Sequence, residues 1–248
     1  LMAADPQATG SLRQLLQLND ILLDRAEKEL SNTLLAEFEE LQRKNTAEGK
    51  RKSDMRDSSE MTKARRVRPI RHGEAPGVRV GDRFQNKGEL LVLGIHDCIA
   101  QGISKPRMED KELFEQGAYA IAVSGVYKGD DDQGERLTYT GVGTTGDQSF
   151  ENPANKALQN NYKKRVPVRV VRKVEGTKDQ KFFYMYDGLY DVVDCYCEEE
   201  DVPAKDDAPE QTGLDCPPPK FRKITKFTLQ RSSGNLQKPS TSTAYDPK

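Results

Sequence analysis

Two tyrosines, an aspartate and several glycines lie close together in one short segment, which reads SGVYKGDDDQGERLTYTG over residues 124–141. The rings of Tyr127 and Tyr139 are suited to stacking on a flat ligand, and the Asp130 carboxylate to accepting hydrogen bonds from an exocyclic amine. Glycines allow backbone N–H and C=O groups to approach a ligand edge closely. The segment therefore predicts a pocket for one flat, polar ring.

The rest of the chain offers no set of residues typical of catalysis or metal binding. The spacing of Cys195, Cys197 and Cys216 fits none of the usual zinc-ligand pairs, so we expect reduced thiols. His96 has no acid or nucleophile at a defined spacing, which favours a structural role. We expect no catalytic residue, no metal and no cofactor.

The overall composition indicates one domain with appendages. The chain has 248 residues, of which 35% are hydrophobic, and a formal net charge of −1. Its mean hydropathy of −0.82 is low for a fully packed globule, so part of the chain is expected to be disordered. It contains no apolar run of about 18 residues and no secretory signal, which predicts a soluble intracellular protein.

From residue 67 onward the pattern predicts strands. Short runs rich in β-branched and aromatic residues are separated by Gly, Pro and Asp, and a helix is expected only at about residues 152–161. The fold class that follows is α+β, mainly β, with a curved, barrel-like sheet. The expected strands are residues 83–85, 90–93, 119–123, 136–140, 166–174, 182–193 and 223–230.

The N-terminal part divides by composition. Residues 1–10 are expected to be a disordered start, and leucines spaced three to four apart predict a helical arm over 11–48, either continuous or divided near Ser31. The arm either docks on the domain or forms a coiled coil with a partner or a second copy. Its wide apolar stripe lacks a clean heptad, which favours docking.

Basic residues dominate the linker predicted at 49–66. It is either a solvated tether or a DNA-contacting segment, and its position just before the domain favours DNA. A charged loop is expected at 104–117, an acidic, Pro-rich loop at 198–219 and a disordered tail at 238–248. Arg165, Arg169 and Arg172 are candidates for a basic face, although alternation points Arg169 and Arg172 to opposite sides of a strand. The phosphate-binding candidates are Arg65, Arg66, Arg68, Lys105 and Arg107.

The pocket segment resembles the signature of the SRA (SET- and RING-associated), or YDG, domain family. The Tyr-Asp-Gly-Leu-Tyr element of that family follows at residues 186–190, within Tyr186 to Val193. Further ordered matches are Pro76 to Asp82, Gly94 to His96 with Gly102-Ile103, Asp147-Gln148, and Pro167 to Arg172. The resemblance covers residues 67–237 and implies an SRA-type sheet.

The same resemblance implies a ligand, a flipped 5-methylcytosine in double-stranded DNA. It assigns stacking to Tyr127 and Tyr139 and the contact with cytosine N4 to Asp130. The methyl and backbone environment falls to Ser124, Val126, Thr140 and Gly102. The first loop, with Ala100 and Gln101, is expected to fill the hole left by the flipped base.

Departures from the family pattern limit what is implied. Val126 stands where a second glycine is usual, and Gly129 replaces an acidic residue. The connection over residues 141–147 is too short for the finger loop that reads the partner strand in members recognising hemimethylated CpG. We therefore expect little discrimination between hemimethylated and fully methylated sites.

Three hypotheses of function remain. The leading one is a nuclear, non-enzymatic reader of modified cytosine, possessing no membrane partner. The alternative is a degenerate SRA scaffold that acts in protein–protein interaction, with chromatin proteins or by self-association, through residues 11–48. An enzymatic role would need SET, RING or nuclease segments that this sequence does not encode.

Overall fold

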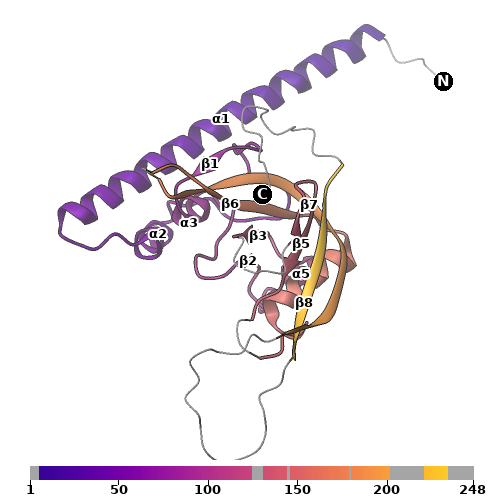
Figure 1. Cartoon of the computed structure of the whole chain (residues 1–248). Helices are drawn as coiled ribbons and strands as arrows, with labels where there is room; N and C mark the ends of the chain where they lie inside the picture. The colour runs from indigo at the N-terminus through magenta and orange to yellow at the C-terminus, as the bar shows by residue number, and fades with distance from the viewer. Residues whose placement is uncertain (1–5, 125–130, 144–145, 179, 202–220, 234–248) are drawn as a thin grey trace, which may run out of the picture.

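The computed structural model places one open sheet between two sets of helices (Figure 1). Within the first helix, side chains are described from residue 22 on. The described residues as a whole are 6–124, 131–143, 146–178, 180–201 and 221–233.

Within the described residues, eight strands form the sheet, in the order β2-β3-β6-β7-β8-β5-β4, with β1 paired to β7 outside that path. All described pairings are antiparallel except that of β3 with β6. The expected α+β, mainly β fold is thus confirmed, and the sheet curves without closing into a barrel (Figure 1). The strands are β1 (Arg83–Phe84), β2 (Ile103–Ser104), β3 (Ala120–Val123), β4 (Asp131–Asp132), β5 (Arg136–Thr140), β6 (Val168–Glu175), β7 (Phe182–Asp201) and β8 (Phe221–Arg231).

The long strand β7 joins the two halves of the sheet. Its first half, from Phe182 to Tyr190, pairs with β6, and its second half, from Tyr190 to Asp201, pairs with β8. A β-bulge interrupts each half, and bulges bend a strand and increase its twist. These two irregularities are consistent with the bend of β7 seen in Figure 1.

Five helices are described: α1 (Pro6–Ala47), α2 (Asp54–Lys63), α3 (Lys87–Val92), α4 (Lys111–Gln116) and α5 (Pro153–Lys164). Helix α5 begins where the Asn152 side chain accepts a hydrogen bond from the Ala154 N–H, and it ends at Arg165 in the left-handed conformation. None of the described helices combines the length and apolar character needed to cross a bilayer.

Hydrophobic side chains form a core on each face of the sheet. One core packs α5 against residues such as Leu137 and Phe227, and the other packs α1 and α3 against Phe84 and Tyr184. Strand β6 contributes side chains to both cores, because successive side chains of a strand point to opposite faces. Val170 lies in the first core and Val171 in the second.

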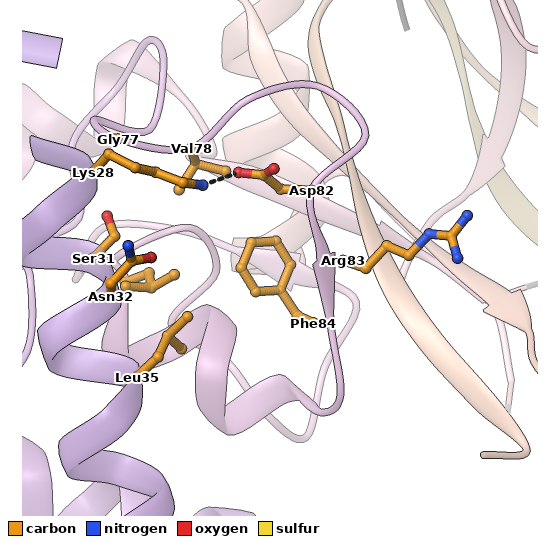
Figure 2. A pocket seen from close by; sticks show the side chains of 10 residues that line it. Lys28, Ser31, Asn32, Leu35, Gly77, Val78, Asp82, Arg83 and Phe84 are labelled. Atoms are coloured by element: carbon orange, nitrogen blue, oxygen red, sulfur yellow. Dashed lines mark hydrogen bonds and ion pairs between the residues drawn. The ribbon is translucent and has the colours of Figure 1, made fainter. Parts of the chain in front are cut away.

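Helix α1 is docked along its C-terminal half. Phe38 is fully buried, and Leu34 is nearly so. Lys28 forms an ion pair of 2.7 Å with Asp82 across the seam, above a small cavity of about 130 Å³ (Figure 2). The N-terminal end of the helix extends past the sheet (Figure 1), and Leu23 is 59% exposed.

Several boundaries expected from sequence are wrong. Helix α1 begins at Pro6, inside the expected disordered start. Of the two alternatives near Ser31, the structure has the continuous helix. The expected linker contains α2, and the expected charged loop at 104–117 contains α4. Strand β7 continues to Asp201, which places residues 198–201 in the sheet instead of in the acidic loop.

The strand expected from Leu90 to Leu93 is wrong as well. It lies in and just after α3, whose first turn is capped by the Asn86 side chain, which accepts a hydrogen bond from the Glu89 N–H. A short apolar run does not distinguish a buried strand from a buried helix, and the cap decides here.

Candidate nucleic-acid interface

Tyr139 and Gly102 meet at one point of the fold, although 37 positions separate them in sequence. Tyr139 lies on β5 and is 4% exposed, and its hydroxyl occupies the space that a side chain at Gly102 would need, 2.3 Å from an added Cβ. The Gly102 carbonyl accepts a hydrogen bond of 2.7 Å from the N–H of Ala122 on β3. Packing therefore requires glycine at position 102, since any larger residue collides with Tyr139, and its role in a base pocket stays a prediction.

His96 holds this glycine from the other side. Its Nε2 lies 3.1 Å from the Gly102 carbonyl, and its Nδ1 lies 3.3 Å from the Cys98 N–H. Complete burial lowers the pKa of His96 to about 4, so the ring is neutral near pH 7. A neutral ring with Nδ1 accepting donates through Nε2 to Gly102, and it thereby orders the loop that contains residues 97–102.

The tip of that loop, expected to fill the hole left by a flipped base, lies at the surface. Ala100 and Gln101 are both exposed. The Gln101 carbonyl accepts a hydrogen bond of 2.9 Å from Lys87 Nζ, which ties the tip to the first turn of α3. Burial lowers the pKa of Lys87.

The remaining pocket candidates are distributed unequally. Ser124 is exposed directly after β3, while Val126, Tyr127 and Asp130 lie outside the described residues. Thr140 is buried on the face of β5 opposite Tyr139, where its Oγ1 lies 2.9 Å from the nearly inaccessible Nζ of Lys226. Thr140 and Tyr139 therefore do not present their side chains to one side.

The Tyr-Asp-Gly-Leu-Tyr element forms a β-bulge. Asp187 has no partner in β6, because Val170 pairs with Gly188 and Val171 with Tyr186. Gly188 has a φ of +89°, a conformation that favours glycine. The bulge directs the buried Asp187 side chain inward, where it meets charged residues of two other strands.

Asp187 is the centre of a buried network that sequence reasoning missed. Its Oδ2 lies 2.6 Å from Arg172 Nε and 2.6 Å from the Tyr190 hydroxyl. Its Oδ1 accepts a hydrogen bond of 2.8 Å from Arg231 Nη2. Asp-Gly inside a run otherwise typical of a strand was the available signal, since this pair is typical of a bulge.

Of the three arginines expected on a basic face, Arg165 is exposed, but the expectation is wrong for the two on β6, which are buried. Arg172 is 4% exposed and lies in this network, and Arg169 is 1% exposed. Arg169 donates to the carbonyls of residues 71, 73, 74, 94 and 95, so it fastens two segments of backbone beside β6.

The five phosphate-binding candidates also separate into groups. Arg65, Arg66 and Arg107 are exposed, and Arg66 lies 3.8 Å from Glu37. Lys105 is half-buried, with its Nζ 5.8 Å from the centre of the Phe114 ring. The prediction that Arg68 binds phosphate is wrong. Its side chain is only 8% exposed and pairs with Glu27 of α1, so it docks the helix and does not face solvent.

The short connection after β5 is fastened at both ends to β8. The Gly141 N–H donates to the Thr225 carbonyl at 2.8 Å, and the Gln148 N–H donates to the Lys223 carbonyl at 2.7 Å. The Gln148 side chain in turn accepts a hydrogen bond of 3.0 Å from the Thr225 N–H. Residues 144 and 145 lie outside the described residues.

The comparison with known families decides the identity of this fold. The SAD/SRA domain matches residues 71–206, which is more than half of the chain. The chain belongs to the SAD/SRA domain family. Its SRA domain includes every strand from β1 to β7 and both buried arginines of β6.

Curated relatives of this SRA protein are longer than the chain. It is 42% identical over 107 residues to the histone-lysine N-methyltransferase, H3 lysine-9 specific SUVH3 of Chlamydomonas reinhardtii, covering 41% of this chain and 11% of that one. It is 33% identical over 163 residues to a UHRF1-like protein of Cryptococcus neoformans, covering 57% and 46%. The chain thus spans less than half the length of each.

Solved structures share the fold beyond the domain itself. KRYPTONITE in complex with mCHG DNA and SAH is 27% identical with a TM-score of 0.71, covering 87% of this chain and 45% of that one. The SUVH5 SRA domain in complex with hemimethylated CG DNA is 34% identical with a TM-score of 0.50, covering 68% and 99%.

Proposed function

We propose that this chain binds double-stranded DNA containing 5-methylcytosine and holds the methylated base, rotated out of the duplex, between Tyr127 and Tyr139. A base inside a duplex shows only its groove edges, so inspection of the whole ring requires extrusion at a cost of a few kcal/mol. Stacking returns about 1–3 kcal/mol per aromatic contact. Asp130 would accept a hydrogen bond from the cytosine N4 amine.

The observation that carries the proposal is the similarity to the SUVH5 SRA domain. That domain has been solved with hemimethylated CG, methylated CHH and fully methylated CG DNA, at 33–35% identity over 68% of this chain. The close approach of Gly102 to Tyr139 supports the same site, because it brings the first loop against the strand that carries the second pocket tyrosine.

We also propose that hemimethylated and fully methylated sites bind with similar affinity. The ends of the connection at 141–148 are hydrogen-bonded to β8, which leaves little chain for a finger that reaches the partner strand. Contact with the opposite base would then fall to the exposed tip of the first loop, Ala100 and Gln101.

In the cell, this domain would act as the targeting part of a nuclear, chromatin-associated protein. The curated relatives named above are an H3 lysine-9 specific methyltransferase and a UHRF1-like protein, and the chain matches only a part of each. We assign DNA binding and no catalytic step to the residues of this chain.

The test is a fluorescence-polarisation titration at one stated salt concentration, because phosphate contacts make affinities salt-dependent. Three duplexes of one sequence carry unmodified, hemimethylated or fully methylated CpG. We expect the methylated duplexes to bind more tightly, by about 5- to 150-fold if the net gain is that of one stacking contact, and to differ from each other by less than about threefold.

Two variants and one control make the test specific to the pocket. Tyr127→Ala and Asp130→Ala should abolish the preference for methylated DNA, whereas Tyr162→Ala, at an exposed position of α5, should leave it unchanged. Equal affinity of the wild-type protein for all three duplexes would refute the proposal. It would favour the alternative of an SRA scaffold that binds a protein partner through the helical arm.

A further inference from the structure

The turn between β4 and β5 is held from inside the fold. The Tyr190 hydroxyl lies 2.7 Å from the Gly134 carbonyl, and Arg172 Nη2 donates to the same carbonyl at 2.9 Å. Arg172 Nη1 also forms an ion pair with Asp132, which is the last residue of β4. Two side chains from the centre of the sheet thus hold a turn at its edge.

Each charge of this cluster has an opposite partner. Arg172 pairs with Asp132 and Asp187, and Arg231 pairs with Asp187 and with the exposed Glu135 of the turn. Burial lowers the pKa of Arg172, but the Asp187 charge, Tyr190 and the hydrogen bonds to both together outweigh burial, so the pKa is raised. Burial and Asp187 both raise the pKa of Tyr190, so its hydroxyl keeps its proton. Removing one member of a buried pair leaves an uncompensated charge, which makes the geometry of the cluster costly to change.

Arg172 contacts both strands that flank residues 125–130. Its backbone pairs with Val123, the last residue of β3, directly before Ser124. Its side chain reaches Asp132 on β4. The same hairpin continues into β5, where Tyr139 lies in register with Phe227 of β8.

We propose that Arg172, Asp187 and Tyr190 are positioning residues of the base pocket: they lock the β4–β5 hairpin, and with it Tyr139, against the end of β3. This proposal rests on the proposed function for its DNA-binding consequence. Stacking offsets the free-energy cost of extruding a base only if the aromatic surfaces are already in place. Loosening the hairpin therefore costs affinity for the methylated base and spares contacts with phosphates.

Tyr190→Phe is the first variant, because it removes one hydroxyl and keeps the ring. At a temperature at which the variant is fully folded by circular dichroism, we expect the ratio of methylated to unmodified affinity to fall about three- to tenfold. The affinity for unmodified duplex should change by less than about twofold. Tyr184→Phe is the matched control, since Tyr184 lies on the same strand with its ring against Phe182, and it should leave the ratio unchanged.

A purely structural role predicts a lower melting temperature with an unchanged affinity ratio, and that result would overturn the proposal. Asp132→Asn, at the solvent-facing side of the cluster, serves the same purpose should Tyr190→Phe not fold.

Amide hydrogen exchange separates this proposal from the proposed function. In DNA-free Tyr190→Phe, the amides of β5 should exchange faster than in the wild type, and those of α5 should not. If the wild type shows no preference for methylated DNA, the proposed function fails. Unchanged exchange in β5 of Tyr190→Phe would overturn the proposal that Arg172, Asp187 and Tyr190 lock the hairpin.

Discussion

At the scale of single residues, the close contact between Gly102 and Tyr139 predicts the effect of a substitution. Gly102→Ala places a Cβ 2.3 Å from the Tyr139 hydroxyl but 3.6 Å from its Cζ. We expect this substitution to destabilise the fold by about 1–3 kcal/mol, as overpacked cores do, and to weaken binding of methylated DNA. The free energy of unfolding from urea titration measures the first effect.

The double variant Gly102→Ala/Tyr139→Phe provides the control. Removing the hydroxyl relieves the collision, so in the Tyr139→Phe background Gly102→Ala should cost less than about 1 kcal/mol. If the alanine costs as much in both backgrounds, the tyrosine hydroxyl does not occupy that space.

His96 supplies a prediction of pH dependence. Its folded-state pKa of about 4 lies below the ordinary value of 6.5, so the unfolded chain binds more protons between these values. Through His96, stability should therefore rise with pH from about 4 to 6.5 and be complete above that range. The chain has only two histidines, so NMR titration can assign each ring. An His96 midpoint near 6.5 would contradict its burial.

At the scale of elements, the C-terminal half of the arm packs against the rest of the fold. Phe38 of α1 is fully buried, whereas Leu30 on the same helix is 48% exposed. Phe38→Ala should destabilise the protein by about 3–5 kcal/mol, and Leu30→Ala by well under 1 kcal/mol, in chemical denaturation. Equal, small effects would mean that the arm is a tether.

The sequence pattern predicted some elements and missed others for physical reasons. Alternation in a β-rich run located β5, β6 and β8 to within two residues. It misassigned the run at 90–93, where a cap at Asn86 starts a helix, and it did not detect α2 within a basic segment.

Residue types predict a pocket chemistry that stays a prediction, but they did not reveal the buried arginines beside it. Arg169 and Arg172 looked like surface charges because their partners are backbone carbonyls and an aspartate that only a bulge brings inward. A buried arginine is recognisable only when its acceptors are placed in three dimensions. Tyr127 and Asp130 stay predictions, since they lie outside the described residues.

At the scale of the whole molecule, the basic residues near the domain have different roles. Arg65 is exposed, whereas Arg68 pairs with Glu27 and Ser31 of α1. Arg65→Ala should weaken binding of all duplexes alike and reduce the slope of log affinity against log salt by about 1. Arg68→Ala should lower the melting temperature and leave that slope unchanged. A reduced slope for Arg68→Ala would place its side chain at the DNA.

The central claim is that the methylated base leaves the duplex, and the fluorescence of 2-aminopurine placed beside it reports this directly, because loss of the stacked neighbour changes its emission. We predict that saturating protein raises the emission of the methylated duplex and leaves that of the unmodified duplex unchanged, and that Asp130→Ala removes the rise. Methylation-dependent binding without any change in emission would contradict base extrusion and would mean that the methyl group is recognised within the stacked duplex.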